Sequence, residues 1–156
     1  MKTDQYLYYA DLRFVDFEFE SVGPKGSIRK IAGFTFIRPN LYSFGFGDLD
    51  EHTGDIIDTV TSNNGDGSKV LNTVAGIVHE FTLVFHEATI YIVGSTPSRT
   101  RWYQMNINAY WQEISILFEI YGYSNDGWEP FQKGVNYLAF MGRRRDNYVT
   151  DADPFQ

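Results

Sequence analysis

Two arginines one residue apart follow a glycine, two hydroxyl side chains and a proline in the stretch VGSTPSRTRWY, residues 93–103. A helix that begins with Pro97 after a Ser or Thr cap leaves free N–H groups in its first turn, and these groups favour an anion. Guanidinium groups bind phosphate or carboxylate oxygens in pairs. The stretch therefore predicts an anion-binding loop. Its candidate ligand-binding residues are Ser95, Thr96, Arg99, Arg101 and Tyr103.

A structural interpretation of the same stretch stays open. Residues two apart on a regular helix point about 200° from each other, so Arg99 and Arg101 converge on one ligand only if this turn is irregular. In the structural interpretation, the two arginines form ion pairs with Asp66, or with Asp48 and Asp50.

Aromatic side chains cluster in and after this stretch, at Trp102, Tyr103, Tyr110 and Trp111. We expect them to pack in the core between a helix and a sheet. If some of them are exposed beside the arginines, they form a base-stacking platform or a protein-interaction patch.

A second loop, GDGSK at residues 65–69, places glycines before a helix whose first turn carries Ser68 and Lys69. It lacks the G-x-x-x-x-G-K-[ST] spacing, so a Walker-type nucleotide site is not supported. One interpretation is a capped helix start, with Gly67 and Ser68 as the cap candidates. The other is that Ser68 and Lys69 contribute to the same anion site as the arginines.

Metal and catalytic chemistry find little support in the spacing of residues. His79 and His86 are seven apart on one helix, whereas chelation from a helix needs a spacing of three or four. The run DLDEHTGDIID has Thr53 where a calcium loop requires glycine, and it is interpreted as a hairpin. A Ser95 or Thr96 nucleophile needs a histidine base, and nothing places His52 there. We therefore expect no metal and no cofactor, and the catalytic residues are unknown.

Composition narrows the class of protein. The chain has 156 residues, 43% hydrophobic and 17% aromatic residues, no Cys, and a formal charge of −7. That charge argues against a general electrostatic grip on DNA, RNA or an anionic membrane. The N-terminal residues lack an apolar signal segment, and no apolar run is long enough to span a bilayer. We expect one cytoplasmic domain over residues 1–145 and a polar tail over 146–156. The basic run RRR, residues 143–145, is interpreted as a solvated end.

Periodicity and turn residues predict the secondary structure. The first part of the chain is an antiparallel meander, and helices and strands alternate after it. Strands are expected over 14–20, 27–37, 41–49, 55–61, 88–94 and 115–123, with a last edge strand over 135–142. Turns are expected at 23–26, 51–54 and 124–130. Helices are expected over 68–86 and from Thr96 to about Asn106–Asn108, followed by a short helical turn over 109–114.

The β-β-β-β-α-β-α-β order predicts an α+β fold in a single domain. We expect a mostly antiparallel, twisted sheet of about six or seven strands, with two main helices packed on one face. If the strands over 55–61 and 88–94 are parallel neighbours, the helix between them is a right-handed crossover. The loops over 63–69 and 94–101 then lie side by side.

Five blocks of the sequence carry a resemblance to a known family: EFESVGPKGSIRKI, YSFGFGD, NNGDGSKVLNTVAGIV, GSTPSRTRWYQM and WEPFQKGVNYLAF. Together they make the chain resemble a family of uncharacterised bacterial proteins that is defined only as a domain of unknown function. NGDGSKVLNTVA and GSTPSRTRWY are the most specific blocks, and the resemblance covers about residues 14–145. It implies an accessory or defence-type protein, similar to toxin–antitoxin components, and it carries no catalytic assignment.

Two functions from different classes follow. The first is a non-catalytic binding module whose polar loop site lies at a sheet edge, with an unknown protein as partner. The second is an enzyme or sensor that binds a phosphate-bearing ligand, such as a nucleotide or an RNA end, in which Arg99 and Arg101 stabilise anionic charge. Self-association into a homodimer through edge strands is a further expectation. The candidate site includes Asp66, Ser68, Lys69, Ser95, Thr96, Arg99 and Arg101.

Overall fold

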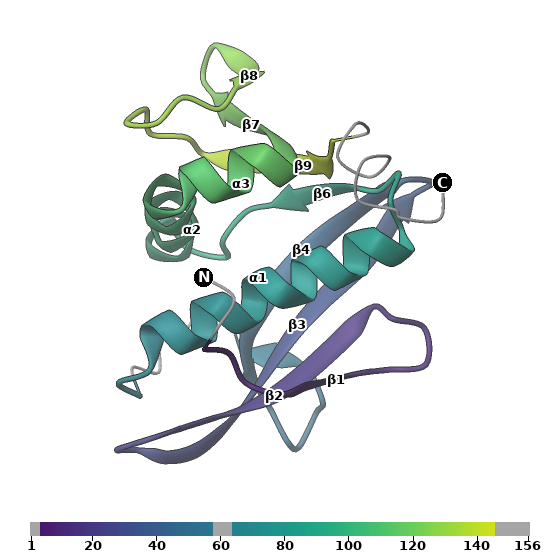
Figure 1. Ribbon diagram of the computed structural model, residues 1–156, viewed down its shortest axis with the longest axis vertical. Helices are drawn as coiled ribbons and strands as arrows, with labels where there is room; N and C mark the ends of the chain where they lie inside the picture. The colour runs from purple at the N-terminus through teal and green to yellow at the C-terminus, as the bar shows by residue number, and fades with distance from the viewer. Residues whose placement is uncertain (1–3, 58–63, 146–156) are drawn as a thin grey trace. The chain divides into compact units, whose positions relative to one another are not determined.

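The computed structural model describes residues 4–57 and 64–145 (Figure 1). The chain divides into two compact units. Unit 1 comprises Met1–Thr35 and Phe44–Val84, and unit 2 comprises Phe36–Ser43 and Phe85–Gln156. Within the described ranges there are nine strands, mostly antiparallel, and three helices. The predicted α+β class is confirmed, but the number of strands is larger than the six or seven expected.

Unit 1 is built on an antiparallel meander. Its strands are ordered β1-β2-β3-β4, with β5 beside β4. The periodicity that predicted a strand over 14–20 is confirmed, because Phe17 and Phe19 are buried while Glu20 on the opposite face is exposed. A two-residue turn joins β2 to β3, and Gly26 after it has a φ of +88°, which glycine adopts without strain. The bounds are β1 Tyr8–Ala10, β2 Asp16–Gly23, β3 Gly26–Arg38, β4 Leu41–Leu49 and β5 Ile56–Ile57.

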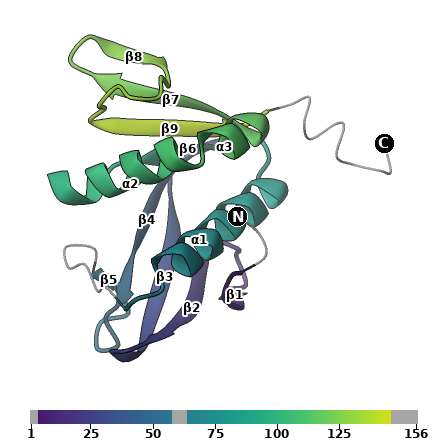
Figure 2. The same ribbon diagram turned by 60° about the vertical axis from the view of Figure 1, so that its left-hand side comes forward.

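One helix, α1 (Gly67–Val84), covers a face of these strands (Figure 2). The helix faces the sheet with an apolar stripe that includes Val70, Val74, Ile77 and Phe81, and the Phe81 ring stacks on Phe34 of β3 at 3.8 Å between ring centroids. The helix ends two residues before the predicted end at residue 86, and its last residue, Val84, is 49% exposed. The cap prediction was also wrong: Asp66 precedes the helix, and its carbonyl oxygen accepts the N–H of Val70.

Unit 2 contains the hairpin end of β3 and β4 and the C-terminal part of the chain. From that hairpin end the strand order runs through β6, β9 and β7 to β8. The pairs β6–β9, β9–β7 and β7–β8 are all antiparallel. The bounds are β6 Thr89–Ile92, β7 Phe118–Ser124, β8 Gly127–Pro130 and β9 Ala139–Arg144.

Two helices, α2 (Pro97–Ala109) and α3 (Trp111–Leu117), pack on one face of these strands (Figure 2). Trp111 of α3 lies against Phe131, with 4.6 Å between the ring centroids, and Phe131 in turn contacts Phe140 of β9. The side chain of Gln104 in α2 accepts a hydrogen bond from Tyr137 N at 3.1 Å and donates one to the carbonyl oxygen of Val135 at 2.8 Å. The core of unit 2 therefore lies between these helices and the strands.

Four predictions for the C-terminal part were wrong. Residues 115–117, expected in a strand, belong to α3, because the short helical turn expected over 109–114 runs on to Leu117. The expected turn over 124–130 contains a further strand, β8, which pairs with β7. The last strand, β9, is central and not an edge strand, because it pairs with both β6 and β7. Arg144 in β9 is accordingly 2% exposed, so the RRR run is not simply a solvated end.

The loops over 63–69 and 94–101 were expected to lie side by side if the strands before them were parallel neighbours, and this condition is not met. Strand β5 pairs with β4, at Asp48↔Ile57 and Leu49↔Ile56, and β6 pairs with β9. The helix between them is therefore not the expected crossover between parallel neighbours. Residues 58–63 and the tail over 146–156 lie outside the described residues. That residues 1–145 form a single domain stays a prediction.

Candidate functional site

The start of α2 has the cap that its sequence predicts. Thr96 has an extended backbone, and its Oγ1 accepts the N–H of Arg99 at 3.2 Å, with Pro97 in the first helical position. Gly94 packs so closely on this turn that a Cβ atom there would lie 2.3 Å from Thr100 N. Thr100 Oγ1 also accepts the N–H of Gly94 at 3.0 Å. The conformation of the stretch is thus fixed by contacts within it.

The two arginines of this stretch lie in different environments. Arg99 is 7% exposed, and its guanidinium lies 5.6 Å from the centroid of the Trp102 ring. Arg101 is exposed, in keeping with the 200° that separates alternate residues of a regular helix. Ser95 is exposed as well, whereas Tyr103 is 8% exposed and belongs to the core. Their assignment as ligand-binding residues stays a prediction.

Ser68 and Lys69 belong to unit 1, whereas residues 94–101 belong to unit 2. Ser68 is exposed at the start of α1. Lys69 Nζ lies 4.4 Å from the centroid of the Tyr6 ring and 3.8 Å from Asp4 Oδ1. Lys69 therefore contacts an aromatic ring and a carboxylate within its own unit. A common anion site with the arginines stays a prediction.

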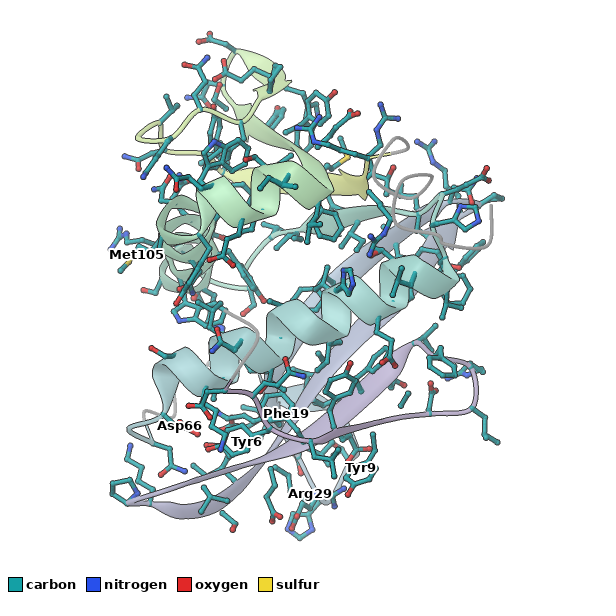
Figure 3. The ribbon with its side chains drawn as sticks, in the orientation of Figure 1. Tyr6, Tyr9, Phe19, Arg29, Asp66 and Met105 are labelled. Atoms are coloured by element: carbon teal, nitrogen blue, oxygen red, sulfur yellow. The ribbon has the colours of Figure 1, made fainter. Side chains whose placement is uncertain are left out.

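Asp66 is the centre of a polar network in unit 1. Its Oδ2 accepts hydrogen bonds from Tyr6 OH and Ser21 Oγ, both at 2.6 Å, and Figure 3 shows Tyr6 beside Asp66 with Phe19 next to it. Partial burial tends to raise the pKa of Asp66, but the hydrogen bonds from Ser21 and Tyr6 outweigh it and hold the pKa below its usual value. Asp66 thus links the N-terminal segment and β2 to the start of α1.

Buried polar residues extend this network. Asn64 is 2% exposed, and its Nδ2 donates to Ser21 Oγ at 3.1 Å and to Gly26 O at 2.9 Å. Lys30 of β3 is 5% exposed and forms an ion pair with Asp48 of β4. The sequence interpretation missed Ser21, Asn64 and Lys30 in this role. Lys30 stands between Arg29 and Ile31, and its partner Asp48 is 18 residues further along the chain, so no local pattern in the sequence indicates the pair.

A surface with a different chemistry lies on the sheet of unit 2, on the face opposite α2 and α3. Strand register places side chains of four strands on that face. On the other face, Ile90 and Phe140 are 2% and 0% exposed and belong to the core. We name the five aromatic and thioether residues on the first face the aromatic face. It comprises Tyr91, Tyr121, Tyr123, Trp128 and Met141.

Three rings of the aromatic face contact one another, and two of these rings are exposed. Trp128 lies 5.1 Å from Tyr123 and 6.2 Å from Tyr91, measured between ring centroids. Trp128 is 41% exposed and Tyr123 is 38% exposed. Such values are high for large aromatic side chains, which usually bury most of their area. Tyr91, Tyr123 and Trp128 therefore form one cluster over the strands, part of which is open to solvent.

The charges beside the aromatic face are paired. Arg143 of β9 lies opposite Glu119 of β7 in the register, and Arg143 Nη2 donates to Glu119 Oε2 at 3.1 Å. The same carboxylate oxygen accepts from Tyr121 OH at 3.3 Å. The pair contributes no net charge to the face. The surface is therefore amphipathic and locally neutral, although the chain has a charge of −7.

Part of this surface could be found from sequence and part could not. The alternation EIYGY over 119–123 indicates a strand with Tyr121 and Tyr123 on one face. Trp128 was assigned to a turn, because SNDGWEP is rich in turn residues, so its pairing with Tyr123 was missed. Of the four aromatic residues considered at the outset, Tyr103 is buried and Trp111 packs against Phe131, as the core interpretation expects.

Within residues 4–57 and 64–145, no group of three or more His, Asp or Glu side chains is arranged to hold a metal ion. In the same part of the chain, no helix has the length and apolar character needed to cross a membrane. The run over residues 48–58 contains the β4–β5 hairpin, with Asp50 N donating to Asp55 O at 2.9 Å, so the hairpin interpretation is confirmed for its described part.

A family model described as "Family of unknown function (DUF6934)" matches residues 2–145. The chain belongs to this family. The match covers both units and all nine described strands, and it confirms the resemblance to a family without an assigned function. No curated protein and no solved structure matches the chain. The function of this family member must therefore be inferred from its own surfaces.

Proposed function

We propose that this chain is a non-catalytic binding module that recognises another protein through the aromatic face of unit 2. The observation that carries the proposal is the exposure of Trp128 and Tyr123 on the sheet face opposite α2 and α3. Clustered, partly exposed aromatic rings are energetically costly in water and are typical of surfaces that bind a partner.

The composition of the surface supports a protein as the occupant. Tyr, Trp, Met and Arg are the residue types enriched in the centres of protein interfaces, and all four occur on or beside this face. Because Arg143 is paired with Glu119, the surface offers no net positive charge for a phosphate backbone. A neutral, apolar protein surface matches it better than a nucleic acid does.

The test compares two surface variants with the parent chain. The double variant Tyr123→Ser/Trp128→Ser removes the two most exposed rings of the aromatic face. The control Met105→Ser/Ile116→Ser removes two side chains on α2 and α3 that are 60% and 64% exposed. Each tagged chain is isolated from the cells that naturally produce it, and the co-isolated proteins are quantified by mass spectrometry.

We expect at least one partner to be retained by the parent and the control and to fall at least tenfold with the aromatic-face variant. Thermal unfolding within a few degrees of the parent shows that the variants are folded. Equal co-isolation with both variants contradicts the proposal, and so does the absence of any protein that depends on the aromatic face.

The phosphate-ligand alternative rests on the start of α2, where Thr96 caps the helix and Arg101 is exposed. The burial of Arg99 speaks against a site in which both arginines bind one anion. We therefore place this alternative second. The polar loop site, a homodimer, a bacterial origin and a cytoplasmic location all stay predictions.

A further inference from the structure

We propose that the free edge of β1 in unit 1 binds an extended, basic segment of a partner protein. This surface is separate from the aromatic face, and the inference does not depend on the function proposed above. It rests on three observations: the position of β1 in the strand order, two hollows that meet at this strand, and the charges that line them.

Among residues 4–57 and 64–145, strand β1 is the first in the strand order and has a neighbouring strand on one side. Its three residues pair with β2, at Tyr8↔Phe19, Tyr9↔Glu18 and Ala10↔Phe17. The backbone N–H and C=O groups along the other edge of such a strand can pair with an added strand. Tyr9 is 68% exposed and Leu7 is 75% exposed, so the surroundings of this edge are accessible.

The first hollow lies along this edge and has a volume of about 560 Å³. It is lined by Gln5–Ala10, Phe14 and Glu80 of α1. Among these lining residues Glu80 is the only one with a charge, and its Oε1 accepts from Tyr8 OH at 2.9 Å. Aromatic rings beside a carboxylate are a suitable environment for the stem and head group of a lysine or arginine side chain.

The second hollow shares Tyr9 and Ala10 with the first and has a volume of about 430 Å³. Its charged lining residues are Asp11, Glu18, Glu20 and Arg29. Figure 3 shows Tyr9 and Arg29 next to each other on this side. Arg29 is already paired with Glu18 and lies 3.9 Å from Glu51 Oε1. Asp11 is likewise occupied, because its Oδ1 accepts the N–H groups of Val15 and Asp16.

The charged residues that line the two hollows favour a basic ligand. Four carboxylates line the two hollows. Arg29 pairs with Glu18 and Arg13 Nε lies 3.6 Å from Asp11 Oδ2, so two negative charges remain in excess and the strand edge lies in a negative local potential. A segment that adds to β1 directs alternate side chains to opposite faces of the sheet. Basic side chains in such a segment can reach Glu80 and Glu20, while its backbone pairs with β1.

The experiment uses a fluorescent seven-residue peptide of alternating Lys and Val, with fluorescence anisotropy as the readout. Three further ligands serve as comparisons: the Glu–Val peptide, the Lys–Val peptide N-methylated at alternate amides, and spermine. The test variant is Glu18→Gln/Glu20→Gln/Glu80→Gln. The matched control, Glu87→Gln/Glu113→Gln/Asp126→Asn, removes the same number of charges from exposed sites in unit 2.

We expect saturable binding of the Lys–Val peptide to the parent and the control, and at least tenfold weaker binding to the test variant. The N-methylated peptide should also bind at least tenfold more weakly, because it cannot pair with the strand edge. Amide chemical-shift changes should centre on residues 8–10. The proposal is overturned by any of three results: no saturable binding up to millimolar peptide, equal weakening by the control variant, or equal affinity for spermine or the Glu–Val peptide.

Discussion

At the scale of single residues, Asp66 connects three parts of unit 1 through its carboxylate. Because Tyr6 and Ser21 donate to the charged form, the pKa of Asp66 is lower in the folded chain than in the unfolded one. A depressed pKa contributes stability that is present above the unfolded value, about 3.9, and is lost as the pH falls through the folded value.

The variant Asp66→Asn should therefore lose less stability between pH 7 and pH 3 than the parent does. At pH 7, Asp66→Ala should be destabilised by about 1–3 kcal/mol, because it leaves the buried Ser21 hydroxyl without this acceptor. Urea unfolding at the two pH values measures both effects. A parent and an Asn variant with the same pH dependence would contradict the role given to this carboxylate.

Arg101 tests the phosphate alternative at the same scale. Because it is exposed, Arg101→Ala should keep the thermal stability of the parent in the absence of ligand. If the start of α2 binds phosphate groups, nucleotides, sulfate or short RNAs should raise the melting temperature of the parent and not that of the variant. A ligand at 100 times its dissociation constant adds about 2.7 kcal/mol, which a thermal-shift panel detects. We expect no shift in either protein.

At the scale of elements, α2 begins where its residues require. Thr96→Ala should destabilise unit 2 by about 1 kcal/mol, because the N–H of Arg99 loses its acceptor. Thr96→Ser keeps the hydroxyl and should retain most of that stability. Urea unfolding of the two variants measures the difference, and equal losses would show that the cap bond contributes nothing.

Gly94 gives a second prediction for the same element. Gly94→Ala should destabilise the chain by about 1–3 kcal/mol, because the added Cβ meets backbone atoms of α2 that cannot move aside. In Gly67→Ala, at the start of α1, the added Cβ meets no atom within 4 Å, and the change should be neutral within about 0.5 kcal/mol. Thermal unfolding of both variants measures the two losses of stability. A loss in Gly94→Ala alone indicates a steric clash, whereas equal losses indicate a general effect of replacing glycine.

The elements also show what sequence can and cannot predict here. The strand LYSFGFGDL and the Thr96-Pro97 helix start were found with their bounds, because alternation, cap and proline are local signals. The central position of β9 and the strand β8 were missed, because pairing partners depend on contacts distant in sequence. The same holds for the candidate sites. The Thr96 cap is a local signal and was predicted, whereas the aromatic face was missed because it depends on the register of four strands.

At the scale of the whole molecule, the charge of −7 argues against polyanions as partners of the chain. We expect no retention on heparin and no shift of double-stranded DNA in a gel at physiological salt, because no general positive field draws polyanions to the chain. Retention of the chain on heparin above about 0.3 M salt would contradict this expectation, because binding at that salt concentration requires a strongly basic surface. The aromatic face is not such a surface, since its Arg143 is paired with Glu119.

The two proposed binding surfaces belong to different units. Unit 2 offers a neutral aromatic surface, and unit 1 offers a negative strand edge, so each selects a partner of different chemistry. Variants on one surface should leave binding at the other unchanged within about twofold, as expected for independent sites that share no residue. The assays above, exchanged between the two sets of variants, measure this independence.

The aromatic face is tested most directly by site-specific photo-crosslinking in the cells that naturally produce the chain. A photoreactive phenylalanine derivative replaces Tyr123 in one chain and Met105 of α2 in the other, both of which are exposed. We predict a discrete covalent adduct with one protein from position 123 and no such adduct from position 105. The absence of a discrete adduct from position 123, or the same adduct from both positions, would contradict the assignment of this face as the binding surface.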